Sequence, residues 1–243
     1  MKALILAAGV GQRLGINHPK CLLRFGWQTL LERHIRSLRP LGVDALVIGV
    51  GYQSQAIAAE LACIGAQGFA STVYNPDYMR GSILSLWTLR EHLKSGNVLL
   101  MDADVLYDER LLERLVTTRI PNCFLLDREF EPGAEPVKLC VHGGRLVEFR
   151  KQVSRELRYD FSGESVGFFR LSGVIAARLA DLTECYVERG RMDEPYEEAI
   201  RDLLLESPEE FGYEDITGLP WVEIDFPEDV RRAEMEILPR LNA

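Results

Sequence analysis

Short apolar runs alternate with stretches of helical spacing over the first half of the chain. The runs span lengths typical of buried strands, at residues 3–8, 45–50, 71–74 and 98–101. Between them, apolar residues recur with helical spacing at residues 30–41, 53–64 and 83–93. Strands that alternate with helices are typical of a parallel sheet covered by helices. We therefore expect an α/β fold with a mostly parallel central sheet and helices on both faces.

The second half of the chain contains more short strands. We expect strands at residues 123–126, 137–141, 146–149, 166–171 and 221–224, and helices at 109–116, 174–187, 196–205 and 228–238. Gly143-Gly144 suits a hairpin turn, so this half is predicted to hold a small β-rich subregion. The polar stretch 151–165 is the best candidate for a mobile loop or lid. No linker or repeat divides the chain, so we expect one domain over residues 1–243, with halves of about 1–118 and 119–243.

Composition and charge narrow the functional class. Hydrophobic residues make up 47% of the 243 residues and charged residues 27%, as in ordinary globular proteins. The net charge of −9 argues against a general nucleic-acid binder, and no apolar run reaches the ~20 residues that span a bilayer. The five cysteines lack the spacing of a zinc site and indicate reduced thiols. We expect a cytoplasmic protein with no nucleic-acid or membrane partner.

The first strand opens directly onto Gly9-Val10-Gly11. A glycine loop after a strand exposes backbone N–H groups, and such groups bind phosphate because no side chain blocks the approach. Leu6 and Ala8 precede the loop in the strand. Arg13 and Lys20 follow it and add two cations that suit a triphosphate. The segment therefore predicts a nucleotide site.

The spacing of this loop differs from two familiar phosphate-binding motifs. A Walker A loop requires Gly-Lys-Ser/Thr, which does not follow Gly11. A dinucleotide fingerprint requires a third glycine where Leu14 stands. The simpler alternative is an ordinary surface turn with two nearby cations.

Two predicted strands end in acidic residues. A buried strand leads into Asp102 and Asp104, and a later strand leads into Asp225. Carboxylates at this edge of a sheet lie where ligands bind in α/β proteins, and Mg²⁺ prefers one or two carboxylates with phosphate oxygens. Glu223 lies on the same strand face as Asp225 and could orient the metal or a substrate. The alternative is that these acids cap the helices that follow.

The segment Leu-Ala-Ala-Gly-x-Gly-x-Arg-Leu at residues 6–14, followed by Pro19-Lys20, resembles the signature of the nucleoside-triphosphate transferases that activate sugar phosphates and phospho-alcohols. Over its full length the chain is similar to nucleotidyltransferases of the GT-A-like fold, also described as nucleotide-diphospho-sugar transferase-like. It more closely resembles the small cytidylyltransferases for phosphocholine, inositol phosphate or 2-aminoethylphosphonate. That closer resemblance is carried by residues 75–86, 137–139, 144–147, 163–169 and 223–225.

This resemblance implies a substrate pair and a set of site residues. The nucleotide, for which CTP is favoured, is expected to contact Leu6, Ala8, Gly9, Gly11, Arg13, Lys20, Gly81, Ser82, Ser85 and Asp102. The metal is Mg²⁺, and Asp104 pairs with Asp225 to hold it. A small acceptor with a phosphate or phosphonate group is expected to contact Lys138, Glu164 and Glu223. The catalytic residues are Lys20, Arg13, Asp104 and Asp225.

Several of these assignments have simpler alternatives. Ser82 stands before a helical pattern, where serine is a natural N-cap. Lys138 would be a solvated residue if its strand lies at an edge of the sheet, and Glu164 would be an ordinary surface acid. The acids at 193–194 and 197–198 flank Tyr196 in the sequence. They suit an amine-bearing acceptor, or simply the positive N-terminal end of a helix.

The expected reaction is nucleotidyl transfer, in which an acceptor oxygen attacks the α-phosphorus and pyrophosphate leaves. That oxygen is already ionised at neutral pH, so no strong general base is required. Lys20 would stabilise charge at the α-phosphate, and Arg13 would face the β- and γ-phosphates. Two alternatives keep the fold: a sugar-1-phosphate transferase that uses UTP, dTTP, GTP or ATP, and a catalytically silent nucleotide sensor. The failed glycine spacing disfavours an oxidoreductase of the Rossmann type.

Overall fold

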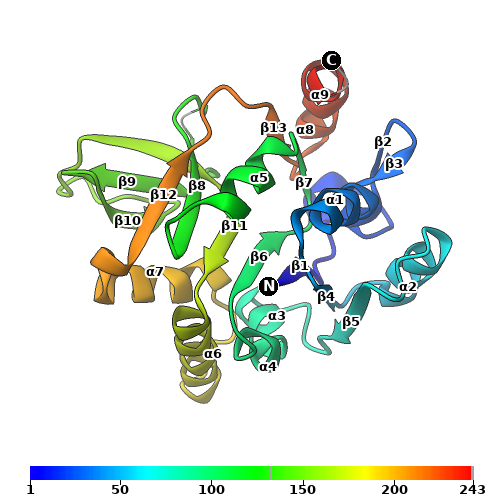
Figure 1. Cartoon of the computed structure of the whole chain (residues 1–243), viewed down its shortest axis with the longest axis horizontal. Helices are drawn as coiled ribbons and strands as arrows, with labels where there is room; N and C mark the ends of the chain where they lie inside the picture. The colour runs from blue at the N-terminus through cyan, green and yellow to red at the C-terminus, as the bar shows by residue number, and fades with distance from the viewer. Residues whose placement is uncertain (132, 242–243) are drawn as a thin grey trace.

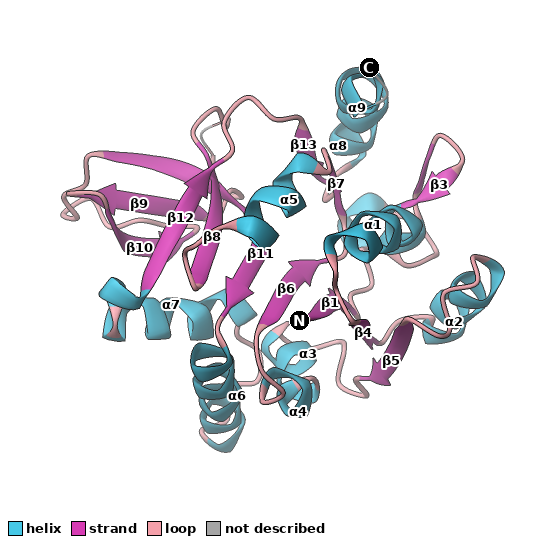
Figure 2. Ribbon diagram, in the orientation of Figure 1, coloured by secondary structure: helices cyan, strands magenta, loops and turns pink. Residues whose placement is uncertain are grey.

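The computed structural model describes residues 1–131 and 133–241 (Figure 1; Figure 2). Its large sheet consists of β1 (Lys2–Ala7), β4 (Ala45–Val50), β5 (Ala70–Tyr74), β6 (Val98–Asp102), β8 (Asn122–Asp127), β9 (Lys138–His142), β10 (Arg145–Arg150), β11 (Phe161–Leu171) and β12 (Phe211–Asp215). Two small sheets pair β2 (Arg24–Phe25) with β3 (Gln28–Thr29), and β7 (Val105–Tyr107) with β13 (Trp221–Glu223). The helices are α1 (Leu30–Leu38), α2 (Ser54–Cys63), α3 (Ile83–Thr88), α4 (Arg90–Leu93), α5 (Arg110–Thr117), α6 (Gly173–Glu188), α7 (Tyr196–Glu206), α8 (Pro227–Arg232) and α9 (Leu238–Leu241).

The sheet has a parallel half and a largely antiparallel half. Its main order is β10-β9-β11-β6-β1-β4-β5, and β8 pairs with both β11 and β12. Strands β6, β1, β4 and β5 run parallel, whereas β11 runs antiparallel to β6, β8 and β9. The prediction of a mostly parallel central sheet with a β-rich subregion is confirmed. The sheet contains strands from both halves of the chain.

Strand β1 is buried on both of its faces, which explains its unbroken apolar sequence. Successive side chains of a strand point to opposite faces, so Ile5 packs into one core and Leu4 into the other. Helices α1 and α5 cover the core of Ile5, and α3, α4 and α6 cover the core of Leu4 (Figure 1). The predicted helices on both faces are confirmed. No helix in the described part of the chain is long and apolar enough to cross a bilayer.

A third apolar cluster joins the N-terminal loop to the C-terminal segment. Leu14 and Phe25 pack there with Leu106 of β7, Ile224 after β13 and Ile237 near the C-terminus. This cluster holds β13 against β7, in an antiparallel pair that is separate from the large sheet. The residues that follow β6 and β13 are therefore brought side by side.

Several elements differ from their predicted extents. The helix predicted over 83–93 is broken at Leu89, and the Thr88 hydroxyl donates a hydrogen bond of 2.7 Å to the Leu84 carbonyl, a contact that bends helices. The last part of the predicted lid at 151–165 belongs to β11, which begins at Phe161. The predicted C-terminal helix contains a π-helical turn at Ala233–Ile237. Strands β2, β3, β7 and β12 were not predicted, because they are too short or too polar to stand out.

Candidate active site

A cavity of about 440 Å³ opens where β1 and β6 end. It is lined by every residue predicted to contact the nucleotide except Gly81, namely Leu6, Ala8, Gly9, Gly11, Arg13, Lys20, Ser82, Ser85 and Asp102. The two predicted metal ligands, Asp104 and Asp225, also line it, and so does Glu223. We call this space the catalytic cavity. Its position at the carboxyl edge of a parallel sheet is where ligands bind in α/β proteins.

The glycine loop allows Lys20 to lie across it. Gly11 has a φ of +66°, in the left-handed region that favours glycine. A Cβ atom at Gly11 would lie 3.1 Å from Cγ of Lys20. Glycine at this position therefore serves both the turn and the close approach of the lysine side chain.

Lys20 joins the two predicted metal ligands. Its ammonium group donates a hydrogen bond of 2.9 Å to Oδ2 of Asp104 and another to Oδ1 of Asp225. Burial disfavours the charged form of Lys20, but the two carboxylates outweigh that effect and raise its pKa. Burial opposes the charge of Asp225 in the same way, yet Lys20 and Arg13 lower its pKa below the usual value. Asp225 therefore stays ionised beside a fixed cation that it shares with Asp104.

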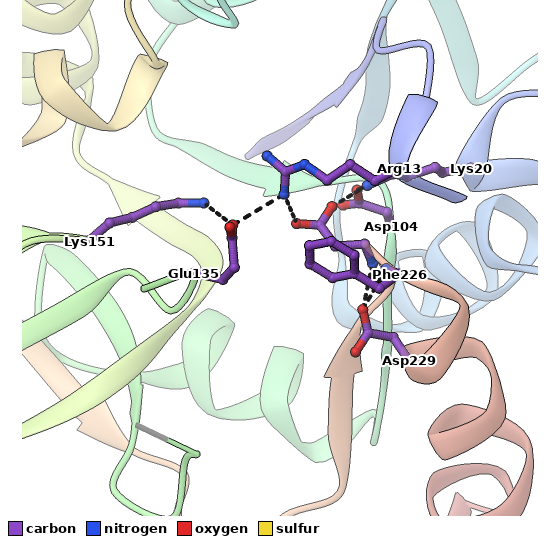
Figure 3. A network of polar contacts seen from close by, with 8 residues as sticks. Arg13, Lys20, Asp104, Glu135, Lys151, Phe226 and Asp229 are labelled. Atoms are coloured by element: carbon purple, nitrogen blue, oxygen red, sulfur yellow. Dashed lines mark hydrogen bonds and ion pairs between the residues drawn. The ribbon is translucent and has the colours of Figure 1, made fainter. Parts of the chain in front are cut away.

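Arg13 extends the network toward the second half of the chain (Figure 3). Its Nη1 atom donates to Oδ2 of Asp225 at 3.0 Å and to Oε2 of Glu135 at 3.1 Å. The same Glu135 oxygen accepts a hydrogen bond of 3.2 Å from Lys151. Glu135 therefore bridges Arg13, which follows the glycine loop, to Lys151 in the segment after β10. No periodic pattern in the sequence predicts this bridge, because Glu135 and Lys151 both stand in irregular polar stretches.

The pairing of β13 with β7 brings three carboxylates together. Glu223 is opposite Val105 in that pair, and the Ile224 N–H donates to the Asp104 carbonyl at 2.9 Å. One carboxylate oxygen from each of Asp104, Glu223 and Asp225 lies within 4.8 Å of the others. Oxygen donors at this spacing fit a hard divalent cation such as Mg²⁺. Burial, followed by the charges of Asp104 and Asp225, raises the pKa of Glu223 to about 8.

Asp104 and Asp225 do not cap helices in the structure, in contrast to the alternative prediction. The N-cap residue of α8 is Phe226, and Asp229 accepts the N–H groups of Asp225 and Phe226 at 2.9 and 2.7 Å. The N-cap residue of α5 is Glu109. The carboxylates of Asp104 and Asp225 are therefore directed at Lys20 and not at helix ends.

Asp102 is half-buried at the end of β6 and lines the catalytic cavity. The Tyr196 hydroxyl donates a hydrogen bond of 2.7 Å to its Oδ2 atom. Burial, followed by the charges of Asp104, Glu197 and Glu223, raises the pKa of Asp102 well above its usual value. A Cβ atom at Gly167, whose φ is +78°, would lie 2.1 Å from the same oxygen. Only glycine leaves room for the carboxylate at that point.

Ser82 is the N-cap residue of α3, as predicted, but its hydroxyl caps a different helix. Its hydroxyl accepts a hydrogen bond of 2.9 Å from the backbone N–H of Tyr196, and so caps α7, whereas it makes no side-chain cap on α3. Gly81 packs beside it, because a Cβ atom there would lie 2.3 Å from the Glu194 carbonyl oxygen. Ser85 is buried and accepts a hydrogen bond of 3.1 Å from Asn75. The segment 81–85 is thereby fixed to the start of α7 along one wall of the catalytic cavity.

The predicted acceptor residues are not gathered in one place. The Lys138 ammonium donates to the carbonyls of Gly133, Pro136 and Lys151 at 2.8, 3.2 and 2.8 Å, and this residue lines neither the catalytic cavity nor the one next to it. Its strand β9 lies between β10 and β11, so the alternative of an edge position is wrong. Glu164 lines a second cavity of about 310 Å³.

This second cavity, which we call the acidic cavity, shares Glu223 and Asp225 with the catalytic cavity. Burial, followed by the charge of Asp127, raises the pKa of Glu164 to about 7. Glu197 lines the catalytic cavity, and burial raises the pKa of its carboxyl as well. The sequence predicts Glu197 only as one member of an acidic cluster around Tyr196. Its direction into the cavity follows from the packing of α7 and has no sequence signal of its own.

Comparison with known proteins agrees with this arrangement. The family model described as the MobA-like NTP transferase domain matches residues 3–154. The chain is 30% identical over 241 residues to the bifunctional IPC transferase and DIPP synthase of Rubrobacter xylanophilus, covering 97% of this chain and 52% of that protein. It is 26% identical over 246 residues to the CMP-5'-(3-aminopropyl)phosphonate synthase of Streptomyces rubellomurinus, covering 98% of this chain and 39% of that protein. The chain thus spans about half or less of the length of these relatives.

Solved structures share the fold. The inositol-1-phosphate CTP transferase from T. maritima superposes with a TM-score of 0.79 at 19% identity, covering 99% of this chain and 96% of that one. The CTP:phosphocholine cytidylyltransferase from Streptococcus pneumoniae superposes with a TM-score of 0.72 at 22% identity, covering 96% and 97%. These likenesses extend over nearly the whole chain, and the family match includes the glycine loop, Lys20 and Asp104. The chain belongs to the MobA-like NTP transferase family.

Proposed function

We propose that this protein transfers the cytidylyl group of CTP to a phosphate or phosphonate oxygen of a small acceptor and releases pyrophosphate. The observation that carries the proposal is the Lys20 ammonium held between Asp104 and Asp225 beside the glycine loop. Such a site offers a fixed cation and several carboxylates at one point, which suits phosphoryl chemistry. The choice of CTP is supported by three similar proteins: the CMP-5'-(3-aminopropyl)phosphonate synthase of Streptomyces rubellomurinus, and the CTP-using transferases from T. maritima and Streptococcus pneumoniae.

The reaction forms one bond and breaks one. An acceptor oxygen forms a bond to the α-phosphorus of CTP, and the bond between that phosphorus and the bridging oxygen of pyrophosphate breaks. The acceptor oxygen needs no general base, because a phosphate monoester is largely dianionic at pH 7. Catalysis then depends on position and on neutralisation of charge.

The residues of this chain divide that work. The glycine loop, Ser82 and Ser85 hold the nucleotide, and Lys20 stabilises charge at the α-phosphate. Arg13 exchanges its contact with Glu135 for the oxygens of the leaving pyrophosphate. Asp104 and Asp225, with Glu223 beside them, would hold Mg²⁺, and the bound ion would neutralise phosphate charge.

Pyrophosphate release with Mg²⁺ tests the proposal. CTP, UTP, GTP, ATP and dTTP are each combined with phosphocholine, 2-aminoethylphosphonate, inositol 1-phosphate and glucose 1-phosphate. Release confined to CTP with a phospho-alcohol or phosphonate is the expected result. Release with glucose 1-phosphate alone would instead make the protein a sugar-1-phosphate nucleotidylyltransferase. Tight nucleotide binding without release from any pair would contradict catalysis and favour a nucleotide sensor.

A further inference from the structure

Asp104 and Asp225, the two acids assigned to the metal, already bind cations of the chain itself (Figure 3). Asp225 accepts hydrogen bonds at both of its oxygens, Oδ1 from the Lys20 ammonium and Oδ2 from Nη1 of Arg13 at 3.0 Å. Asp104 accepts a hydrogen bond of 2.9 Å from the same ammonium at Oδ2. One lysine thus bridges both acids, at the point where three carboxylates suit a divalent cation.

This bridge is shielded from solvent. The side chains of Lys20, Asp104 and Asp225 are only 16%, 19% and 21% exposed. Water and salt weaken such ion pairs much less than they weaken pairs on the surface. An incoming cation therefore has to overcome the attraction between the ammonium and both carboxylates.

The ammonium and a divalent cation cannot share these two acids without cost. Both are positively charged, and like charges repel strongly where little water surrounds them. The ammonium nitrogen also has no lone pair, so it cannot act as a metal ligand itself. Occupation of Asp104 and Asp225 by one of the two cations therefore opposes occupation by the other.

Lys20 has a second place to which its ammonium can move. Its Cγ atom lies 3.1 Å from where a Cβ atom of Gly11 would be, and both residues line the catalytic cavity. The lysine side chain is a flexible four-carbon stem, so its ammonium can turn from the acids toward the glycine loop. The triphosphate that the proposed function puts at this loop brings several negative charges, which attract the ammonium away from the two acids.

We propose, on the basis of the proposed function, that the Lys20 ammonium competes with the divalent cation for Asp104 and Asp225. Without nucleotide, the ammonium keeps the binding of this cation weak. When the triphosphate enters, it draws the ammonium away, and the two carboxylates become available to the cation. Tight binding of the metal is thereby coupled to binding of the nucleotide.

Binding of Mn²⁺ to the full chain without nucleotide tests the competition. Mn²⁺ suits the same oxygen ligands, and its free concentration is measured by electron paramagnetic resonance. Lys20→Met removes the competing charge and is expected to lower the Kd for Mn²⁺ by at least about tenfold. Lys20→Arg retains the charge and is expected to keep this Kd within about threefold of the wild type.

Lys151→Met is the matched control for the loss of a nearby charge. Lys151 lines a small cavity together with Glu223, but its ammonium pairs with Glu135 at 3.2 Å, and the described ion pairs of Asp104 and Asp225 do not include it. We expect this control to change the Kd for Mn²⁺ by less than about threefold.

Two further measurements keep the test independent of folding and of turnover. Lys20→Met leaves two acids close together, so Mn²⁺ is expected to raise the urea midpoint of this variant more than that of the wild type. With saturating CTP, the difference in Mn²⁺ affinity between the two proteins is expected to shrink to less than about threefold, because the triphosphate has drawn the ammonium away. CTP chelates Mn²⁺ equally in both samples, so this comparison is unaffected.

Equal Kd values for Mn²⁺ in the wild type and Lys20→Met, or an equal gain in Lys151→Met, would overturn the competition. A tenfold difference that persists with CTP would overturn the release of the ammonium by the nucleotide. Either result leaves nucleotidyl transfer intact, because pyrophosphate release is measured separately. Absence of pyrophosphate release with every acceptor would overturn the proposed function and not the competition between the two cations.

Discussion

The Tyr196 hydroxyl donates a hydrogen bond of 2.7 Å to Asp102, and so joins the first residue of α7 to the last residue of β6. The backbone N–H of the same tyrosine donates to the Ser82 hydroxyl at 2.9 Å. One residue from the second half of the chain thus holds two walls of the catalytic cavity. Because Tyr196 is buried, its hydroxyl needs such a partner, and the contact fixes the distance between α7 and the carboxyl edge of the sheet.

Replacement of Lys20 by methionine is predicted to affect turnover more than nucleotide binding. Lys20→Met keeps the length of the side chain but removes the charge that faces the α-phosphate in the proposed reaction. We expect kcat to fall by about 100-fold or more, while the Kd for CTP changes by only a few fold. Steady-state pyrophosphate release and calorimetric titration with CTP measure the two quantities. Lys94→Met, at a lysine paired with Asp181 on the surface, is the control. Unchanged kcat in Lys20→Met would exclude the proposed role.

Removal of the divalent metal and removal of one ligand are predicted to have the same effect. Excess EDTA is expected to abolish pyrophosphate release, and added MgCl₂ to restore it. Asp225→Asn is expected to abolish release at every MgCl₂ concentration, because an amide is a poor ligand for this cation and leaves Lys20 with one partner carboxylate. Circular dichroism checks that the fold is retained, and Asp181→Asn at an exposed acid is the control. Full activity in EDTA would contradict the assignment of the metal.

Gly167 is predicted to tolerate no side chain, because a side chain there would collide with Asp102. A control at Gly144 separates this collision from the cost of the backbone conformation. Gly167 and Gly144 have φ values of +78° and +76°, so alanine at either position costs about 1–2 kcal/mol in backbone conformation. A Cβ atom at Gly167 would also lie 2.1 Å from Oδ2 of Asp102, whereas nothing lies within 4 Å at Gly144. We expect Gly167→Ala to lower the free energy of unfolding by at least about 1 kcal/mol more than Gly144→Ala does. Urea unfolding of the two variants measures this difference, and equal losses would show that the Asp102 side chain moves freely.

The buried His34 is predicted to make stability depend on pH. Its Nδ1 atom lies 3.1 Å from the Tyr107 hydroxyl. Its Nε2 atom lies 3.2 Å from the carbonyl oxygen of Ala103, the residue between Asp102 and Asp104. Burial lowers the pKa of His34 from 6.5 to about 4. The unfolded chain therefore binds more protons than the folded one between these two values, and the free energy of unfolding falls as the pH drops through this range.

The loss of unfolding free energy at low pH follows from the difference between the pKa values of His34 in the unfolded and folded chain. It amounts to about 3 kcal/mol at full extent, since one pKa unit corresponds to about 1.4 kcal/mol. His34→Gln cannot titrate there, so its unfolding free energy is expected to fall less than that of the wild type between pH 6.5 and pH 4. Urea unfolding at a series of pH values tests this. Parallel curves for the two proteins would contradict the assignment of a neutral, buried imidazole.

The sequence by itself determined the order of the main elements and most of the predicted residues that line the catalytic cavity. The residues at 3–14 form a local unit, in which an apolar strand and a glycine turn are encoded within one short segment. The acids Asp102, Asp104 and Asp225 were recognised because each follows the end of a strand, and a strand end is a local property too. For the same reason the helices on both faces of the sheet were predicted from periodicity alone.

Only the tertiary structure decided which of these residues meet. The pairing of β13 with β7 places Glu223 and Asp225 beside Asp104. The strand at 221–224 was predicted, but β7 was not, because its three residues are too few for a periodic signal. The bridge from Arg13 through Glu135 to Lys151, and the direction of Glu197, depend on packing between segments far apart in the chain. Lys138 was assigned to the acceptor from its position in a motif, but its ammonium is bound by nearby carbonyls. Side-chain direction at such positions is set by long-range contacts, which no local pattern encodes.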